Sequence, residues 1–246
     1  MPFQAIEQQR LYRQIADQIE QLIRAGEFAA GGRLPAEREL AKRLGVSRPS
    51  VREAMIALEL SGLVEIRMGS GVFVTERSRS VAAQQNSVDR GPGPFELIRA
   101  RKIVETETAA LAAKERDDDH IAAIADSIDL MRREMALGTM TEEGDRLFHI
   151  RVAEATRNSA LVYLVEAMWD WGRGEMWRAI ERIAPQTVLR PTSLAQHEKI
   201  FAAIRAGDGQ AAHEAMFAHL DTVESFFLAE AEHDTSRLSA AGGDAR

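Results

Sequence analysis

The stretch LPAERELAKRLGVSRPSVRE, residues 34–53, constrains the fold of this chain more than any other part of the sequence. Its first half carries apolar residues at helical spacing, and Gly45 suits a left-handed cap at the end of that helix. Ser47 then offers an N-cap oxygen to a second helix, on which Arg48 and Arg52 lie four residues apart and project together. The pattern predicts a helix-turn-helix whose second helix fits the major groove of DNA.

The flanking residues extend this motif into a winged helix-turn-helix. An amphipathic helix is expected over 8–25, before the motif. After the motif, 63–68 and 72–75 have the composition of two short strands, and Gly-Ser-Gly at 69–71 makes the turn between them. Because this tip has no bulky side chain, its backbone can approach DNA closely, including in the minor groove.

The distribution of charge divides the chain. The net charge is −7, which by itself disfavours a DNA-binding protein. Residues 1–80, however, carry 12 Lys and Arg against 10 Asp and Glu, a balance of +2, whereas residues 81–246 carry 19 against 28, a balance of −9. This asymmetry favours two domains with different partners.

Several classes of protein are excluded by composition. The chain has no cysteine, so disulfides, thiolate metal sites and thiol catalysis are ruled out. No apolar run approaches the roughly 18–20 residues needed to span a bilayer, and residues 1–10 lack the apolar core of a signal peptide. We therefore expect a soluble, cytoplasmic protein without a membrane partner.

The second half of the chain is predicted to be helical throughout. Residues 77–93 are rich in Ser, Gln, Asn, Asp, Gly and Pro, as expected of a linker. Beyond them, helices are expected near 94–114, 118–136, 141–156, 159–183, 192–206 and 208–232. The predicted fold class is therefore mainly α. It comprises a winged helix-turn-helix DNA-binding domain over 1–76, the linker over 77–93, an all-α antiparallel helical bundle over 94–232 and a disordered tail over 233–246.

A group of polar residues in the helical half has the chemistry of a metal site. Asp145 and His149 are spaced i, i+4 on one helix, so the carboxylate and the imidazole point the same way. His197 and His219 each lie on a later helix, and bundling of these helices would bring three imidazoles and one carboxylate together. That set suits Zn²⁺, Ni²⁺, Mn²⁺ or Fe²⁺. On spacing alone, the alternative is that the histidines pack in the core or lie at the surface.

Two further features have both a structural and a functional interpretation. Arg101 and Glu105 lie four residues apart on one helix. They form either an exposed salt bridge or an arrangement in which Arg101 faces inward and clamps a carboxylate. All three tryptophans fall within 169–177, where they serve as core and interface residues or floor a sugar-sized pocket.

Motifs in both halves carry a resemblance to a known family. In the DNA half they are Leu34-Pro-Ala-Glu-Arg-Glu39, the run from Gly45 to Glu53, and Gly62-Leu-Val-Glu65. In the helical half they are Arg101 with Glu105, Leu111-Ala-Ala113, Asp145-Arg-Leu-Phe-His149, the run from Ala153 to Asn158, His197 with Ile200, and His219-Leu220. Together they resemble the GntR family of bacterial transcription regulators over residues 11–228. Within it, the chain is similar to the branch whose all-helical, metal-containing effector domain is named after the fatty-acid regulator. It is most similar to the hexuronate-responsive repressors, which it resembles at Gly93-Pro-Phe-Glu-Leu-Ile98, Ala153-Glu-Ala-Thr156 and the Trp169-Asp-Trp…Met176-Trp177 pattern.

This resemblance implies a homodimeric repressor, not an enzyme, that binds a palindromic operator in double-stranded DNA. It implies a small organic acid as effector, most simply a sugar acid such as a hexuronate or an aldonate. The residues implied to contact DNA are Arg38, Ser47, Arg48, Ser50 and Arg52, with Gly69 and Gly71 bringing the wing to the minor groove. The residues implied to hold a divalent metal, Zn²⁺ first, are Asp145, His149, His197 and His219, and those implied to hold the effector are Arg101 and Asn158.

Other functions remain compatible with these residues. The effector could be another small organic acid, such as lactate or pyruvate. A metal-dependent enzyme fused to a DNA-binding module could use the same ligands to activate water, and a metal sensor would need no organic ligand. A long-chain acyl-CoA sensor is disfavoured, because an acyl chain needs an apolar tunnel and the predicted site is polar.

Overall fold

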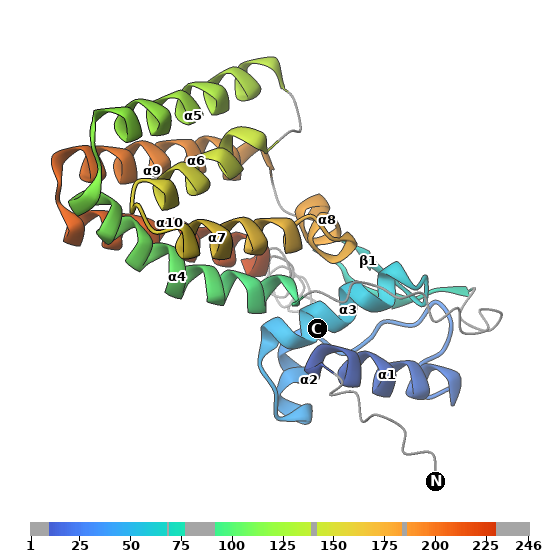
Figure 1. Ribbon diagram of the computed structural model, residues 1–246. Coiled ribbons are helices and arrows are strands. Elements are labelled where there is room, and N and C mark those ends of the chain that lie inside the picture. The colour runs from blue at the N-terminus through green and yellow to red at the C-terminus, as the bar shows by residue number, and fades with distance from the viewer. Residues whose placement is uncertain (1–9, 68, 77–91, 139–141, 184–185, 230–246) are drawn as a thin grey trace, which may run out of the picture.

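The computed structural model describes residues 10–67, 69–76, 92–138, 142–183 and 186–229. A small winged domain lies at one end of the molecule and a larger helical bundle at the other (Figure 1). The linker predicted over 77–93 falls outside the described residues except for its last two positions, and the tail predicted over 233–246 falls wholly outside them.

The winged domain is built from three helices and a hairpin, as the sequence predicts. They are α1 (Leu11–Arg24), α2 (Glu37–Leu44), α3 (Arg48–Leu60), β1 (Val64–Arg67) and β2 (Gly71–Val74). Gly45 ends α2 with φ 67°. Ser47 begins α3, since its side chain accepts a hydrogen bond from the backbone N–H of Ser50 at 3.3 Å. These two local features set the angle between α2 and α3.

The hairpin forms a two-stranded antiparallel wing. Val64 pairs with Val74 and Arg67 pairs with Gly71. Gly71 has φ 107°, a conformation that L side chains rarely adopt, and a Cβ there would lie 2.6 Å from Arg33 Nε. Glycine is therefore required at this corner of the wing by both its backbone conformation and its close neighbour.

The C-terminal half is an all-helical bundle. Its helices are α4 (Pro94–Glu115), α5 (Asp118–Leu137), α6 (Glu143–Glu154), α7 (Ser159–Trp171), α8 (Glu175–Ile183), α9 (Gln186–Ala206) and α10 (Gly209–Ala229). The most extensive contacts join α10 to α4 and to α9, and α5 to α6. The observed fold class is mainly α, in agreement with the prediction.

The helix predicted over 159–183 is interrupted in the structure. The chain leaves helical geometry between Gly172 and Gly174, which separates α7 from α8. Glycine lowers the stability of a helix interior, and the break lets α8 turn toward the winged domain (Figure 1). In addition, α9 begins at Gln186 and includes Pro191, whereas the sequence predicted a start at 192.

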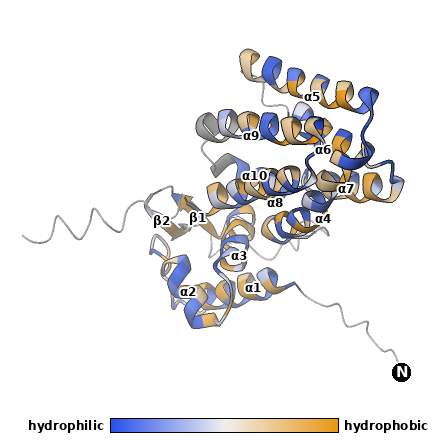
Figure 2. Ribbon diagram, turned by 90° about the vertical axis from the view of Figure 1, so that its left-hand side faces the viewer, coloured by the Kyte–Doolittle hydropathy of each residue, from blue (hydrophilic) through white to orange (hydrophobic). Residues whose placement is uncertain are grey.

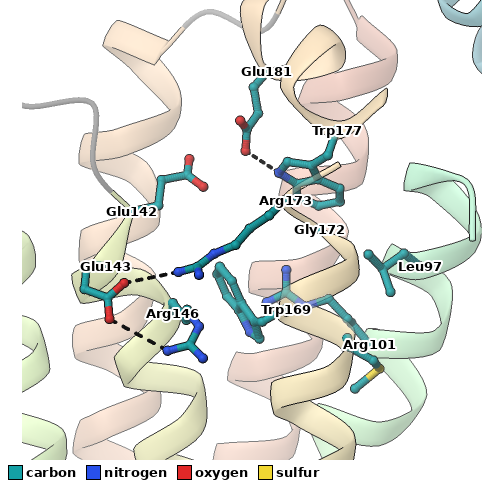
Figure 3. Close-up of a pocket in the computed structure, with 11 residues that line it drawn as sticks. Leu97, Arg101, Glu142, Glu143, Arg146, Trp169, Gly172, Arg173, Trp177 and Glu181 are labelled. Carbon is teal, nitrogen blue, oxygen red and sulfur yellow. Dashed lines mark hydrogen bonds and ion pairs between the residues drawn. The ribbon is translucent and has the colours of Figure 1, made fainter. Parts of the chain in front are cut away.

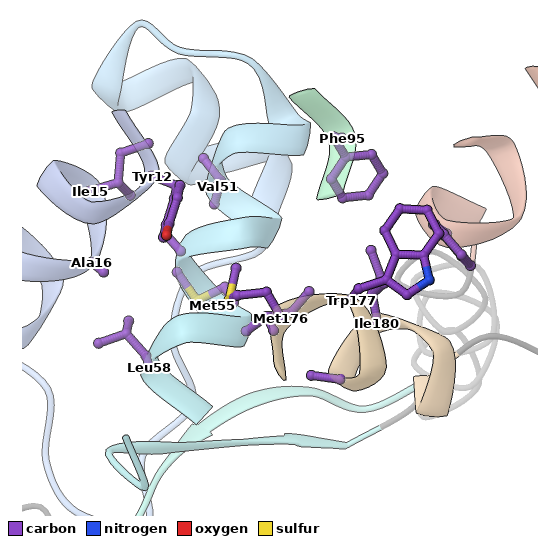
Figure 4. Packing of buried hydrophobic residues seen from close by; sticks show 14 of the residues in the cluster. Tyr12, Ile15, Ala16, Val51, Met55, Leu58, Phe95, Met176, Trp177 and Ile180 are labelled. Carbon is purple, nitrogen blue, oxygen red and sulfur yellow. The ribbon is translucent and has the colours of Figure 1, made fainter. Parts of the chain in front are cut away.

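Two clusters of buried apolar side chains stabilise the molecule. One lies wholly in the bundle, around Phe148. The other is continuous from the winged domain into α4, α7 and α8. In Figure 4, Met176 of α8 lies beside Met55 of α3, and Phe95 of α4 lies beside Trp177 of α8. The two halves of the chain therefore share one apolar core.

A polar contact also joins the two halves. The backbone N–H of Phe95, in the first turn of α4, donates to Glu53 Oε1 of α3 at 2.8 Å. Gly93 permits this approach, because a Cβ there would lie 2.6 Å from the Glu53 carboxyl carbon. Burial raises the pKa of Glu53 to about 7, although the backbone N–H groups of Phe95 and Glu96 oppose the rise.

Hydrophobic and hydrophilic residues alternate along each helix (Figure 2), as expected of helices that pack one face on a core and expose the other. Within the described ranges, none of the helices combines the length and the apolar character required to cross a bilayer.

Candidate functional site

The four predicted metal ligands converge inside the bundle. Asp145 and His149 come from α6, His197 from α9 and His219 from α10, and one candidate ligand atom from each lies within 4.8 Å of all the others. The three histidines are buried. The prediction that separate helices bring these side chains together is confirmed.

The innermost atoms of this cluster face one another. His149 Nε2 lies 3.3 Å from His197 Nε2. Asp145 Oδ1 lies 3.5 Å from His149 Nε2 and 3.0 Å from His197 Nε2. That carboxylate oxygen is buried and accepts no hydrogen bond of good geometry from the described residues. A buried carboxylate oxygen without a hydrogen-bond donor is unfavourable, and a cation bound between it and the two imidazole nitrogens would compensate its charge.

The outer nitrogen of each imidazole has a polar neighbour. Glu105 Oε2 pairs with His149 Nδ1. Ser193 Oγ lies 3.4 Å from His197 Nδ1 and Gln196 Oε1 lies 3.2 Å from His219 Nδ1. The Gln196 amide is itself oriented, because its Nε2 donates to Thr222 Oγ1 at 2.8 Å. The oxygens of Glu105 and Gln196 accept, so they favour a proton on Nδ1 of His149 and His219 and an Nε2 lone pair that points into the cluster, as in known metal sites. The Ser193 hydroxyl can either donate to His197 Nδ1 or accept from it.

The protonation states of Asp145, His197 and His219 also suit a metal. Burial alone would raise the pKa of Asp145, but the charges of His197 and His149 hold that pKa well below its usual range. Burial lowers the pKa of His197 and, together with repulsion from the other imidazoles, lowers that of His219 well below its ordinary value. Burial opposes a charge on His149 as well, but Glu105 and Asp145 outweigh it and raise the pKa of that imidazole. A divalent cation binds an ionised carboxylate and neutral imidazoles, so its binding would displace a proton from His149. The residues present therefore fit such a metal.

Arg101 faces inward, which settles the choice between its two predicted orientations. It is 4% exposed, and its Nε donates to Glu105 Oε1 at 2.6 Å. Its guanidinium carbon lies 4.4 Å from the centre of the Trp169 ring. Burial would raise the pKa of Glu105, but Arg101 and His149 hold it at about 2. Glu105 therefore links Arg101 directly to a candidate metal ligand.

A cavity of about 310 Å³ opens beside Arg101 (Figure 3). Its charged lining residues are Arg101, Arg146, Arg173, Glu142, Glu143 and Glu181, and its aromatic ones are Trp169 and Trp177. A smaller neighbouring cavity of about 60 Å³ shares Arg101 and both tryptophans and reaches Asp145 and His219. A ligand in the larger cavity would therefore lie next to the metal cluster.

Not every predicted effector residue lies at this cavity. Asn158 is exposed at the opposite end of α7 from Trp169, where its side chain caps the helix by accepting from the Ala160 N–H at 3.0 Å. The structure therefore does not bring Asn158 to the pocket. Conversely, Arg146 and Arg173 line the pocket and were not predicted. The sequence offered one signal for each: Arg146 follows the candidate ligand Asp145, and Arg173 lies within the tryptophan-rich segment 169–177.

The predicted DNA-contacting residues fall into two groups. Arg38 and Ser47 are exposed, and Gly69 and Gly71 lie at the corners of the wing turn, as predicted. The residues of α3 differ. Ser50 is buried, and its hydroxyl lies 2.8 Å from that of Ser47, so in this conformation it faces the N-cap of α3.

Arg48 and Arg52 are brought together, but on a shared carboxylate. Glu37 pairs with Arg48 at 3.2 Å and with Arg52 at 3.0 Å. Arg52 is only 3% exposed, and Arg48 also donates to the backbone oxygen of Leu228, on α10, at 2.7 Å. The two arginines therefore project together, as predicted, but in this conformation acceptors from α2 and α10 bind their guanidinium groups. Their contact with DNA stays a prediction.

A winged helix-turn-helix joined to a helical domain with a pocket lined by charged residues is the architecture of a DNA-binding transcription regulator. The family model of the bacterial regulatory proteins of the gntR family matches residues 11–74, and that of the FCD domain matches residues 96–222. The chain belongs to the GntR family of bacterial transcription regulators, with an FCD domain as its C-terminal half.

Curated relatives agree with this assignment. The Uxu operon transcriptional regulator of Escherichia coli K12 is 37% identical over 225 residues, which cover 89% of this chain and 88% of that protein. The Exu regulon transcriptional regulator of the same organism is 36% identical over 232 residues, covering 93% and 88%. Its putative L-lactate dehydrogenase operon regulatory protein is 31% identical over 234 residues, covering 88% and 86%. These relatives are regulators by name, which favours a regulator over an enzyme.

Proposed function

We propose that this protein is a homodimeric repressor that binds a palindromic operator and senses a sugar acid beside a divalent metal in its FCD domain. The observation that carries the proposal is the polar cavity, which adjoins both the buried Arg101 and the Asp145 cluster. In a dimer, each winged domain would bind one half of the operator.

The lining of the cavity supports a polyhydroxylated acid. Arg101 can bind a carboxylate through its fork of N–H donors. Three glutamates and two further arginines surround the rest of the space and can accept from and donate to hydroxyl groups. The tryptophan rings offer flat apolar surfaces to the C–H faces of a sugar. Because a three-carbon acid held near Arg101 would leave most of these groups without a ligand partner, a hexuronate or an aldonate fits better.

The cluster of three imidazoles and one carboxylate supports Zn²⁺ first, with Ni²⁺, Mn²⁺ and Fe²⁺ as alternatives. Asp145, His149, His197 and His219 would hold the ion. When bound, it supplies open coordination positions for carboxylate and hydroxyl oxygens. Arg101 balances the charge that remains on the effector.

A sugar acid that binds this cavity is expected to raise the melting temperature of the metal-loaded protein. Ligand at 100 times its dissociation constant adds about 2.7 kcal/mol of stability, a shift of a few degrees for a chain of this size. The measurement is a thermal melt with hexuronates, aldonates, lactate and pyruvate, before and after chelation. We expect one sugar acid to shift the melt and chelation to abolish that shift.

Other outcomes of the same panel identify the rival functions. A shift with lactate or pyruvate alone would contradict the sugar-acid assignment, and the likeness to the L-lactate dehydrogenase operon protein makes this the second candidate. Turnover of an added acid would indicate an enzyme. Operator binding that responds to metal alone, with no acid required, would indicate a metal sensor.

Replacing Arg38 with alanine is expected to weaken operator binding by about 5–150-fold, because one good arginine contact to DNA is worth about 1–3 kcal/mol. Arg38 is exposed on α2. The measurement is a gel-shift titration at fixed salt with the DNA upstream of the protein's own gene. Arg132→Ala is the matched control, since it removes the same charge from α5 in the bundle. Equal binding by the two variants would show that Arg38 does not contact the operator.

A further inference from the structure

Helix α8 has two different surfaces. Trp177 and Glu181, one turn apart, line the effector cavity, and Trp177 Nε1 donates to the Glu181 carboxylate. Met176 and Ile180, also one turn apart, belong to the apolar core that α8 shares with α3 (Figure 4). Met176 is 3% exposed and Ile180 is fully buried. The same short helix therefore contacts both the effector cavity and the helix expected to read DNA.

The end of α10 makes a second connection between the cavity and α3. Phe227 lines the smaller cavity and packs edge-on against Trp177, with ring centres 5.6 Å apart. The next residue, Leu228, accepts the hydrogen bond from Arg48 through its backbone oxygen. Phe227, which lines the smaller cavity, is therefore the chain neighbour of Leu228, whose backbone oxygen binds Arg48, an arginine predicted to contact DNA.

In this conformation α3 offers little exposed surface to a major groove. None of the side chains from Arg48 to Leu60 is fully exposed. Ile56, which follows Arg52 by one turn on the same face, is completely buried. An α-helix with its side chains is about 10–12 Å across, and the major groove is about 12 Å wide. There is no room in the groove for α3 with α8 packed against it.

We propose that α8, with the end of α10, is an intramolecular cover for the recognition helix, and that the effector holds this cover in place. The inference rests on the proposed function, since it requires that a sugar acid occupy the cavity. The cavity is completed by Trp177 and Glu181 in the covered arrangement, so a ligand that contacts them stabilises that arrangement. DNA binding needs the uncovered arrangement. Effector and operator therefore compete by linkage, without sharing any atoms.

The cover gives a structural route by which the effector can release this repressor. The effector lowers operator affinity and so releases the repressor from DNA. Couplings of this kind are typically about 5–150-fold in affinity. Because linkage is reciprocal, the operator must weaken effector binding by the same factor.

The test alters the contact between α8 and α3 without changing a side chain that lines the cavity. Met176→Glu places a charge in the buried interface, and Met176→Ala is a milder variant in case the first disturbs folding. Met135→Glu is the matched control, because Met135 is an exposed methionine of α5. Operator affinity is measured by fluorescence anisotropy on the metal-loaded, full-length protein, with and without D-glucuronate, D-galacturonate or another acid that shifts the melt. Circular dichroism and metal content verify the fold of each variant.

The expected result is that the acid weakens operator binding of the parent protein and of Met135→Glu by at least about fivefold. Both Met176 variants should bind operator more tightly without acid and respond less to it. Tighter operator binding in the presence of the acid would overturn the proposal, and so would folded Met176 variants that behave like the parent. If no acid affects any protein but the Met176 variants still bind operator more tightly, the cover stands and the proposed effector is wrong.

Discussion

Replacing Glu105 with glutamine is expected to weaken metal binding by about 10–100-fold and to lower the free energy of unfolding by about 3–5 kcal/mol. Glu105 is 2% exposed and pairs with both Arg101 and His149. A neutral amide cannot offset the buried charge of Arg101, which accounts for the loss of stability. It also anchors His149 Nδ1 less firmly, so that the imidazole is less basic and its Nε2 is less well oriented toward the cluster.

Two measurements separate these effects. Zn²⁺ affinity is obtained by calorimetric titration of the metal-free protein, and stability by urea unfolding of the same sample. Glu107→Gln is the matched control on α4, because the Glu107 side chain is 75% exposed and its only described ion pair is with His213. That variant should stay within about 0.5 kcal/mol of the parent. Unchanged metal affinity in Glu105→Gln would mean that Glu105 does not orient His149.

Replacing Glu53 with glutamine is expected to remove a pH dependence of stability worth about 3 kcal/mol. The pKa of Glu53 rises from 4.5 to about 7 on folding, and each unit corresponds to about 1.4 kcal/mol. Between these two pH values the folded state keeps a proton that the unfolded chain has lost. The stabilisation is therefore complete below pH 4.5 and is lost as the pH rises through about 7.

The glutamine variant keeps the acceptor for the Phe95 N–H but does not titrate. It should match the parent at pH 5 and exceed it in stability at pH 8, as measured by urea unfolding. The charged groups of α4 that act on Glu53 are Glu96, which raises its pKa, and Arg99, which lowers it. Glu65→Gln, on the exposed face of the wing, should retain the pH profile of the parent. A steep profile in Glu53→Gln would assign the titration to another group.

The parts of this protein that could be predicted from sequence are those set by local geometry. Gly45 and Ser47 make the turn between α2 and α3 through a left-handed cap and an N-cap, and both act within a few residues. Asp145 and His149 share a face of α6 because helical periodicity places them there. The motifs that resemble the GntR family then indicated that His197 and His219 would join them, which the structure confirms.

The parts that could not be predicted depend on contacts between distant segments. Arg52 is separated from Glu37 by most of the helix-turn-helix, and only packing shows that the two pair. Arg173 reaches the cavity because α7 ends just before it. Asn158 has an amide side chain of the kind that binds ligands, but in this structure that side chain caps the N-terminus of α7.

By itself, the sequence determined the mainly helical fold, the winged helix-turn-helix and the pairing of Asp145 with His149 on one helix face, because helical period, capping and turn chemistry act over short distances. His197 and His219 followed from the resemblance to the GntR family, not from a local pattern. The tertiary structure decided which way Arg101 faces, which side chains line the cavity, and that α8 lies against α3. These features depend on burial of apolar and charged groups between elements far apart in the chain, and no local pattern encodes that burial. The position of α8 is the most consequential of them, since it places the effector cavity and the recognition helix on two sides of one short helix.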